Sequence, residues 1–254
     1  MGGPLTGPLT GPGPAVGAGP TGPGSAGPGT ALLTREFFAG SSLKVAPRVL
    51  GCVLEHQTPG GLVAVELTEV EAYEGSADPA SHSYRGRTAR NAVMFGPPGR
   101  AYVYFTYGMH FCVNLVCGPE GTAVAVLLRA GRVIEGAPLA AARRLAGRPA
   151  ARLPDRDLAR GPGRLCQALG IDRAQDGADV CDPASPLRVR AGPPAAAPRP
   201  ISRGPRVGVS SAADRAWRFW LTGDPTVSAY RPHVPRTRPK PVSPSAAEGG
   251  TMGR

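Results

Sequence analysis

The chain has 254 residues, enough for one domain with a sizeable core and too few for two large ones once its Pro- and Gly-rich ends are set aside. Its formal charge of +11 comes almost entirely from arginine and favours a polyanionic partner, nucleic acid or an anionic membrane surface, although GC-rich coding gives any protein the same bias. The five cysteines form no CxxC pair and no zinc-like cluster, and no stretch is long enough to cross a membrane. With no secretory signal, these features predict a cytoplasmic protein with reduced thiols.

Both ends of the chain are predicted to be flexible. Residues 1–30 contain almost only Gly, Pro, Thr and Ala, and so cannot bury enough apolar surface to offset the entropy lost on ordering. Residues 231–254 return to Pro, Ser and Gly with scattered arginine, which predicts a flexible basic tail. Between them lies a folded part, 31–230, in which the Pro/Ala-rich stretch 191–205 is predicted to be a surface loop.

The folded part begins with helical patterns and a long strand. Leu32–Phe38 is predicted to be a short helix and Leu43–Leu54 a second one, before a Gly-Gly turn. Gly61–Tyr73 alternates with a period of two, which predicts a strand. The face expected to be apolar carries Val63, Val65, Leu67, Glu69, Glu71 and Tyr73.

A basic polar loop, Ser81–Asn91, leads to a predicted hairpin. Its strands are Tyr102–Thr106 and Phe111–Cys117, with Tyr107 and Met109 at the tip where turns usually carry polar residues. A bulky apolar tip can insert between DNA base steps and hold a kink. The alternative, commoner for an isolated hairpin, is that the tip folds back onto the core.

The second half of the folded part completes the fold class. Ala123–Arg129 is predicted to be a strand and Arg164–Ile171 a helix, while Arg206–Val209 and Trp217–Leu221 are predicted to be closing strands. Because helices do not alternate regularly with strands, the sequence predicts an α+β fold in a single domain.

Two glutamates stand out on the long predicted strand. Glu69 and Glu71 continue an apolar face, and a buried carboxylate is costly unless it is paired or used in chemistry. The alternative is that the strand leaves the core at this point and both glutamates are solvated. Arg129, at the end of an apolar strand, is the candidate partner, although such a pair can be purely structural and a terminal arginine is usually solvated.

Aromatic residues cluster in the same part of the chain. Five of the six tyrosines lie between Tyr73 and Tyr107, together with His82 and the arginine-rich loop. This composition is typical of a base-stacking pocket beside a basic groove. Tyrosines in strands are otherwise core or cross-strand packing residues, and His82 alone is weak evidence.

The sequence lacks the motifs that several other kinds of binding and catalysis require. The Gly161-Pro162-Gly163 turn has neither the third glycine of a dinucleotide fingerprint nor the Lys-Ser/Thr of a phosphate loop. Only two lysines are present, Lys44 and Lys240, so a Schiff-base mechanism is poorly provided for. The sequence therefore predicts no metal and no cofactor.

Read together, nine stretches resemble the 3-methyladenine DNA glycosylase family of the alkyladenine type. They follow one another with near-constant spacing over about residues 33–230. The stretches are Thr68–Tyr73, Ala80–Ser83, Arg90–Asn91, Met94–Phe95, Tyr102–Met109, Phe111–Asn114, Leu127–Ala130, Gly161–Ile171 and Arg206–Val209. Each is weak alone, and the ordered combination is specific.

The resemblance implies a curved antiparallel sheet with flanking helices and a protruding β-hairpin that enters the DNA minor groove. By position, Glu71 matches the general base and Arg129 the residue that helps to hold the attacking water. The remaining matches are Tyr73, His82 and Tyr104 as walls of a flipped-base pocket, Asn114 as the residue that rejects guanine through its exocyclic amino group, and Tyr107, with Met109 beside it, as the intercalating wedge.

The implied activity is that of a monofunctional DNA glycosylase. Such an enzyme flips alkylated or deaminated purines out of duplex DNA and hydrolyses the N-glycosidic bond, leaving an abasic site. The expected partner is duplex DNA containing damaged purines, and the expected state is a monomer associated with the nucleoid. Two positions depart from the family pattern and can change substrate range: His110, where a second aromatic is expected, and Val93, where a small residue is usual.

Two other classes of function compete with this one. A non-catalytic DNA-binding module with an aromatic base pocket explains the charge and the tyrosines, but not a paired Glu71 and Arg129. An enzyme of free nucleosides explains the carboxylate and the aromatic residues, but leaves the basic surface and the hairpin tip without a role.

Overall fold

The computed structural model describes residues 1–2, 31–106, 108–147, 152–194 and 197–233. The helices are α1 (Arg35–Phe38), α2 (Ser42–Val49), α3 (Ala137–Arg144) and α4 (Pro162–Leu169), with short 3-10 turns η1 (Gly75–Ala77), η2 (Ala92–Phe95), η3 (Asp155–Asp157) and η4 (Arg173–Gln175). The strands are β1 (Val53–Thr58), β2 (Gly61–Glu74), β3 (Ala101–Thr106), β4 (His110–Cys117), β5 (Val124–Glu135), β6 (Ala159–Arg160), β7 (Leu187–Arg190), β8 (Ile201–Gly204) and β9 (Arg218–Leu221).

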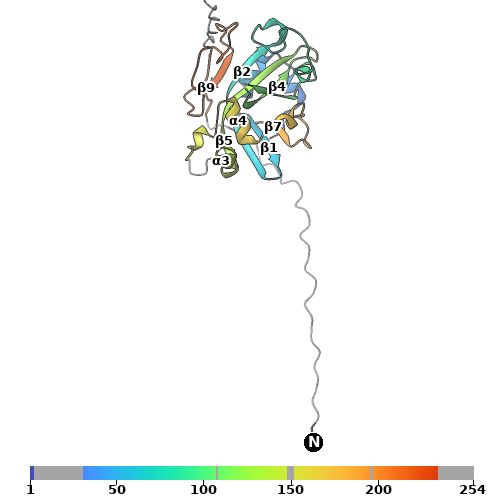
Figure 1. Ribbon diagram of the computed structural model, residues 1–254, viewed down its shortest axis with the longest axis vertical. Coiled ribbons are helices and arrows are strands. Elements are labelled where there is room, and N and C mark those ends of the chain that lie inside the picture. The colour runs from blue at the N-terminus through green and yellow to red at the C-terminus, as the bar shows by residue number, and fades with distance from the viewer. Residues whose placement is uncertain (3–30, 107, 148–151, 195–196, 234–254) are drawn as a thin grey trace, which may run out of the picture.

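Nine strands of the described chain form one antiparallel sheet (Figure 1). Its main path runs β3-β4-β5-β2-β1-β7, while β6 pairs with β5 and β9 joins β2 to β8. The 14-residue strand β2 is central, because it pairs with β5 along most of its length, with β1 in its first half and with β9 in its second. The second half of β2 is therefore held from both sides.

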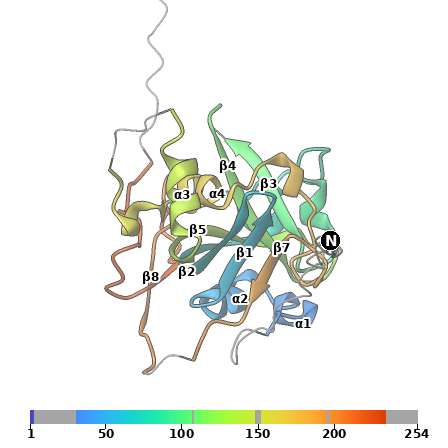
Figure 2. The ribbon, with the colours of Figure 1, turned by 90° about the horizontal axis from the view of Figure 1, so that it is seen from below.

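Helices cover the sheet and close the core. α2 packs against β2, and α4 packs against β4 and β5 with α3 beside it (Figure 2). Apolar side chains from the sheet and from both helices belong to one continuous buried cluster. The predicted α+β fold in one domain is confirmed. Among the described residues, no helix is long and apolar enough to span a membrane.

β2 does not keep one face toward the core. Its pairing with β5 slips on both sides of Glu69, which is the mark of a bulge. The core residues of β2 are Val63, Val65 and Leu67 before the bulge and Val70 and Ala72 after it. The predicted face that joined Glu69 and Glu71 to Val63 is therefore wrong, since the extra residue turns both glutamates to the side away from this cluster.

Three other sequence expectations also need correction. The second helix ends at Val49 instead of reaching Leu54, because Leu50 is extended and Gly51 has a φ of +83°. The segment Arg206–Val209 is not a strand, and it contributes lining residues to the cleft described below. Within the predicted loop 191–205, Ile201–Gly204 forms β8.

The predicted hairpin is confirmed as β3 and β4. Thr106 pairs with His110, and the Met109 N–H donates to the Thr106 carbonyl to close the turn. The Met109 side chain is 66% exposed, so this part of the tip does not fold back onto the core. Tyr107, the predicted wedge, lies outside the described residues, as does most of both predicted tails.

Candidate active site

A cleft of about 720 Å³ opens between β2, β4, β5 and α4. Four of the predicted site residues line it: Tyr73, His82, Tyr104 and Arg129. A smaller hollow shares the three aromatic residues and adds Asn114, whose side chain donates to the Tyr102 carbonyl at 3.3 Å. The fold thus brings together residues that are spread from β2 to β5 in the sequence.

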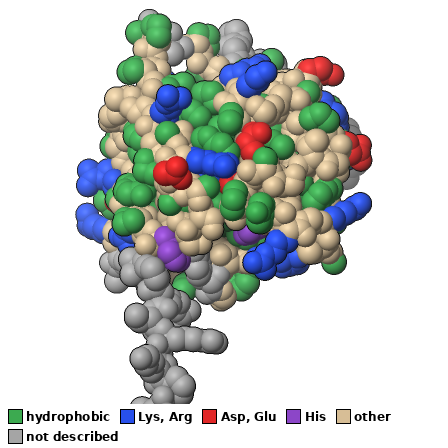
Figure 3. Space-filling model, turned by 90° about the horizontal axis from the view of Figure 1, so that it is seen from above, with side chains coloured by type: hydrophobic (Ala, Val, Ile, Leu, Met, Phe, Trp, Pro, Cys, Tyr) green, Lys and Arg blue, Asp and Glu red, His purple; other side chains and the backbone are tan. Residues whose placement is uncertain are grey.

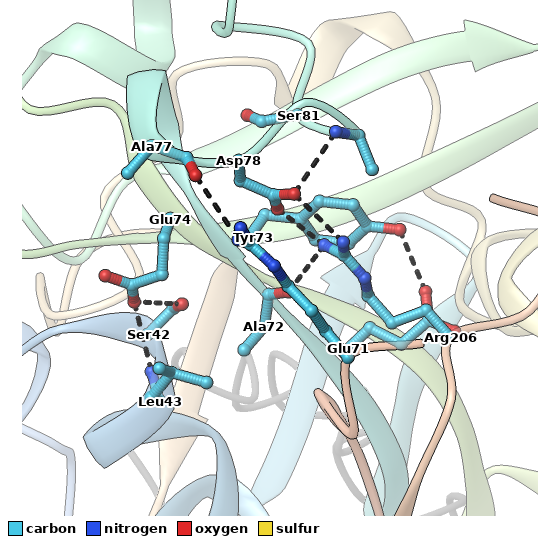
Figure 4. A network of polar contacts seen from close by, with 12 residues as sticks. Ser42, Leu43, Glu71, Ala72, Tyr73, Glu74, Ala77, Asp78, Ser81 and Arg206 are labelled. Carbon is cyan, nitrogen blue, oxygen red and sulfur yellow. Dashed lines mark hydrogen bonds and ion pairs between the residues drawn. The ribbon is translucent and has the colours of Figure 1, made fainter. Parts of the chain in front are cut away.

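Glu71 is fully buried directly behind the wall of the cleft. One carboxylate oxygen accepts the Tyr73 hydroxyl at 2.9 Å (Figure 4). The other accepts the Val207 N–H at 2.7 Å and lies 3.2 Å from the Arg129 guanidinium. All three partners line the cleft. The alternative in which the strand leaves the core and Glu71 is solvated is therefore wrong.

Glu69 lies in a second buried cluster next to Glu71. One of its oxygens accepts from Arg129 at 2.8 Å, Arg218 at 2.7 Å and the Ser228 hydroxyl at 2.9 Å, and the other accepts the Ser228 N–H at 2.7 Å. Burial raises the pKa of Glu69, but the two guanidiniums outweigh it, so the net pKa lies below its ordinary value. This carboxylate is consequently held in its charged form.

Arg129 connects the two carboxylates. Its Nε binds Glu69, while a terminal nitrogen faces Glu71. Burial lowers the pKa of Arg129, yet Glu71 and Glu69 more than reverse this, and the guanidinium stays charged. The prediction that Arg129 pairs with one of the two glutamates is confirmed, and it pairs with both.

The aromatic side chains form a compact wall. The His82 and Tyr104 rings meet edge to face with centroids 4.4 Å apart, and Tyr104 stacks on Tyr102 at 5.5 Å. Burial, together with the positive charge of Arg90, lowers the pKa of His82, which favours a neutral imidazole. Burial raises the pKa of Tyr73 and Tyr104 well above the ordinary value, so both phenols keep their protons.

Asn91 holds the basic loop in place, a role that sequence reasoning did not assign. Its amide donates to the carbonyls of His82 and Gly86, both at 3.0 Å, and its carbonyl accepts the Thr88 N–H at 2.6 Å. The side chain is 3% exposed. A buried asparagine that spans the loop explains how His82, in a polar segment, reaches the pocket wall.

Arg206 is the main functional candidate that sequence reasoning missed. It is 1% exposed and binds both oxygens of Asp78, at 2.5 and 2.9 Å, as well as the Ala72 carbonyl at 3.1 Å (Figure 4). The sequence placed it in a strand, because an apolar pattern follows it. The signal available in the sequence was its place in Arg206–Val209, one of the stretches that carry the family resemblance.

The mouth of the cleft is basic. Arg144, Arg160 and Arg164 line it, and Arg164 is exposed. His110 also lines the cleft and packs on α4, where a Cβ added to Gly163 would lie 2.9 Å from its ring. On the face shown in Figure 3, Lys and Arg side chains follow much of the outline and hydrophobic side chains lie between them. A polyanion fits this distribution of charge.

The two departures from the family pattern lie in different places. His110 lines the cleft itself, whereas Val93 packs among partly buried residues beside Met94, which lines the smaller hollow. No lysine lines the cleft within the described chain. In the same residues, no three His, Cys, Asp or Glu side chains group as metal ligands would.

Comparison with known proteins identifies the family. A family model described as methylpurine-DNA glycosylase matches residues 36–225. A provisionally named 3-methyladenine DNA glycosylase of Streptomyces avermitilis is 58% identical over 215 residues, covering 84% of this chain and 98% of the relative. Proteins with the same provisional name are 53% identical in Leifsonia xyli, covering 78% of this chain and 92% of the relative, and 50% identical in Mycobacterium tuberculosis, covering 78% and 94%. The chain belongs to the methylpurine-DNA glycosylase family, whose members are DNA-repair glycosylases.

Proposed function

We propose that this protein excises damaged purines from duplex DNA as a monofunctional glycosylase, with Glu71 activating a water molecule for attack on the N-glycosidic bond. The observation that carries the proposal is the buried carboxylate of Glu71 behind a cleft lined by Tyr73, His82 and Tyr104. A positioned carboxylate that removes a proton from water contributes roughly 10²–10⁴-fold to a rate. The expected product is an abasic site in an unbroken strand.

The contacts of Glu71 leave one acceptor position of its carboxylate unused. A carboxylate has about four acceptor positions, and Tyr73, Val207 and Arg129 supply three donors. One position therefore remains for a water O–H. The Arg129 guanidinium lies 3.2 Å from the same carboxylate and would also be in reach of a water molecule bound there.

The aromatic wall fits a cationic purine better than a neutral one. An N-alkylated purine carries positive charge and gains roughly 0.5–2 kcal/mol from the face of an electron-rich ring. The charge also makes the base a good leaving group, so one carboxylate suffices and no second acid is required. Because Tyr73 and Tyr104 hold their protons tightly, they are poor acids for a neutral leaving group. We therefore infer faster release of alkylated purines than of hypoxanthine.

The hairpin and the basic mouth support a duplex substrate. Flipping a nucleotide costs a few kcal/mol, and a side chain that fills the gap offsets part of this cost. Met109 is exposed at the tip, and Tyr107, next to it in the chain, remains the predicted wedge. Such a substrate would place the protein at the nucleoid.

Base release tests the proposal. Wild type and Glu71→Gln are incubated with methylated duplex DNA, with a duplex carrying one hypoxanthine, and with the free nucleosides, and alkali is added afterwards to cleave abasic sites. The expected result is abasic sites from wild type alone, no strand break before alkali, and no reaction with nucleosides. Salt-dependent binding without base release would instead support a non-catalytic DNA-binding module. Turnover of free nucleosides would support an enzyme of small ribosyl compounds.

A further inference from the structure

Arg206 takes part in a group of cation–π contacts that includes the cleft residue Tyr73. Its guanidinium lies 4.6 Å from the centroid of the Tyr73 ring and 5.1 Å from the centroid of the Trp217 ring. A second guanidinium, that of Arg215, lies 4.4 Å from the centroid of the Trp217 ring. Cation–π contacts between desolvated groups are stronger than exposed ones. Tyr73, which forms the wall of both hollows, is thus supported from behind by a buried cation.

The same guanidinium also fixes the start of the loop that carries His82. It makes a two-pronged contact with Asp78, which is fully buried and also accepts the Ala80 N–H at 3.1 Å (Figure 4). Two residues further along is His82, which lines the smaller hollow together with Tyr73 of β2 and contacts the Tyr104 ring. Two-pronged Arg–carboxylate contacts set an orientation as well as a distance, which a lysine does not reproduce.

The backbone next to Arg206 reaches the proposed base. Val207 donates its N–H to Glu71 at 2.7 Å, while the Arg206 guanidinium holds the carbonyl of Ala72, the residue between Glu71 and Tyr73. Arg206 therefore contacts β2, the strand that carries Glu71, through its side chain. The next residue, Val207, supplies the N–H that the Glu71 carboxylate accepts.

A role in packing alone does not account for this arrangement. A buried ion pair is often no more stabilising than apolar side chains of similar volume. The Nε of Arg206 also has no hydrogen-bond partner among the described residues, so the ion is held at some cost. What the ion pair provides is a fixed geometry between β2, which carries Tyr73, and the loop that carries His82.

We propose that Arg206 is a positioning residue for base excision: it holds Tyr73, the loop that carries His82 and the Val207 donor in one arrangement. Capture of the purine and activation of water by Glu71 then depend on the same buried cation. The inference rests on the proposed function and extends it to a residue that touches neither the purine nor the water.

Single-turnover base release from a methylated duplex, with enzyme in saturating excess, tests this inference. Arg206→Gln is expected to lower the rate constant by about 100-fold, the scale of a 1 Å misplacement, with duplex affinity changed less than about 3-fold. Arg206→Lys restores only part of the rate, because it keeps the charge and loses the fork. Arg199→Gln is the matched control, since Arg199 pairs with Glu66 at the other half of β2 and its rate should equal wild type.

Asp78, the ion-pair partner of Arg206, provides a second experiment that does not require the Arg206→Gln variant to fold. Asp78→Asn keeps the side-chain shape and the acceptor for Ala80, and is expected to lower the rate constant by about 10-fold. The double variant with Arg206→Gln should be no slower than Arg206→Gln alone, because both changes break one unit. Additive losses, or a wild-type rate in either single variant, would overturn the inference.

A fluorescence signal separates positioning from lost stability. In a Trp220→Phe background Trp217 is the only tryptophan of the chain. Binding of a lesion-containing duplex should change its emission in that background, because the purine is proposed to contact Tyr73 and Arg206 contacts both Tyr73 and Trp217, and adding Arg206→Gln should remove the change. A folded Arg206→Gln protein that keeps both the signal and the rate contradicts the role of Arg206. If wild type itself released no base, the proposed function would fail instead.

Discussion

The two halves of β2 carry the same kind of interaction with different surroundings. In the first half, Glu66 is paired with Arg132 and Arg199, whose side chains are 53% and 34% exposed. In the second half, Glu69 and Glu71 share Arg129, which is 7% exposed in its side chain. The first arrangement joins the sheet to the segment before β8, and the second lies behind a cleft. The two halves therefore differ in the exposure of the arginine partners and in their distance from the cleft, which is lined by Arg129 and not by Arg132 or Arg199.

The largest expected difference between the halves concerns stability. Glu69→Ala leaves Arg218 buried without its carboxylate partner and Arg129 with Glu71 alone, and we expect it to lower the free energy of unfolding by roughly 3–5 kcal/mol. Glu66→Ala should cost less, because Glu66 is buried but its partners Arg132 and Arg199 reach solvent and stay hydrated when the carboxylate is removed. Urea denaturation followed by circular dichroism measures both. Equal losses in the two variants would show that burial does not distinguish the halves.

A smaller effect is expected from the anchors of the flanking loops. Asn91→Ala removes three hydrogen bonds that a buried side chain makes to the loop carrying His82, and should cost roughly 1–3 kcal/mol while slowing base release, because His82 loses its support. Thr58→Val, at the turn that opens the first half of β2, removes contacts to Gly61 and Arg143 and should leave base release unchanged. Calorimetry and single-turnover kinetics are measured on the same samples. Slow base release by Thr58→Val, or a wild-type rate for Asn91→Ala, would contradict the assignment of the Asn91 contacts to the candidate site.

Acid unfolding sharpens the comparison further. The pKa of Glu69 in the folded protein lies below its ordinary value of 4.5. The ion pairs of Glu69 therefore stabilise the fold at pH values above 4.5, and this stabilisation is lost as the pH falls through the lower, folded-state pKa. Wild type should therefore lose stability more steeply below about pH 4.5 than Glu69→Gln, which has no carboxylate to protonate. Parallel curves for the two proteins between pH 5 and pH 2 would contradict the charged state assigned to Glu69.

The smallest effect concerns DNA affinity. Arg164 lines the mouth of the cleft, whereas Arg132 lies at the first half of β2. Removing one phosphate contact reduces the slope of log affinity against log salt by about 1. Arg164→Ala is expected to show this reduction and Arg132→Ala to show none, as measured by fluorescence anisotropy on an undamaged duplex. An equal slope for both variants would place the duplex elsewhere on the surface.

Much of the fold follows from local sequence patterns. The period of two in Gly61–Tyr73 and the paired strands around Met109 correspond to β2, β3 and β4, because alternation in a half-buried strand is set by local contacts. β7 and β8 span only 4 residues each, too few for a period to be visible, and both form through pairing with distant strands.

The candidate site was predictable for several residues on strands and, through the family resemblance, for His82 in the basic loop. Glu71, Arg129, Tyr73 and Tyr104 all lie on β2, β3 or β5, and the structure brings them together as the sequence suggested. The bulge at Glu69 was not predictable, since it arises from the pairing of β2 with two different strands. Arg206 was missed because its partner Asp78 lies far away in the sequence.

The most direct test of the central claim compares Glu71→Gln with Glu66→Gln, one variant for each half of β2. Single-turnover release of base from methylated duplex DNA is measured with enzyme in excess, and duplex binding is measured on the same preparations. Glu71→Gln is expected to bind DNA normally and to lose roughly 10²–10⁴-fold in the rate constant, while Glu66→Gln stays within about 2-fold of wild type. A folded Glu71→Gln protein that releases base at the wild-type rate would show that Glu71 does not activate the water.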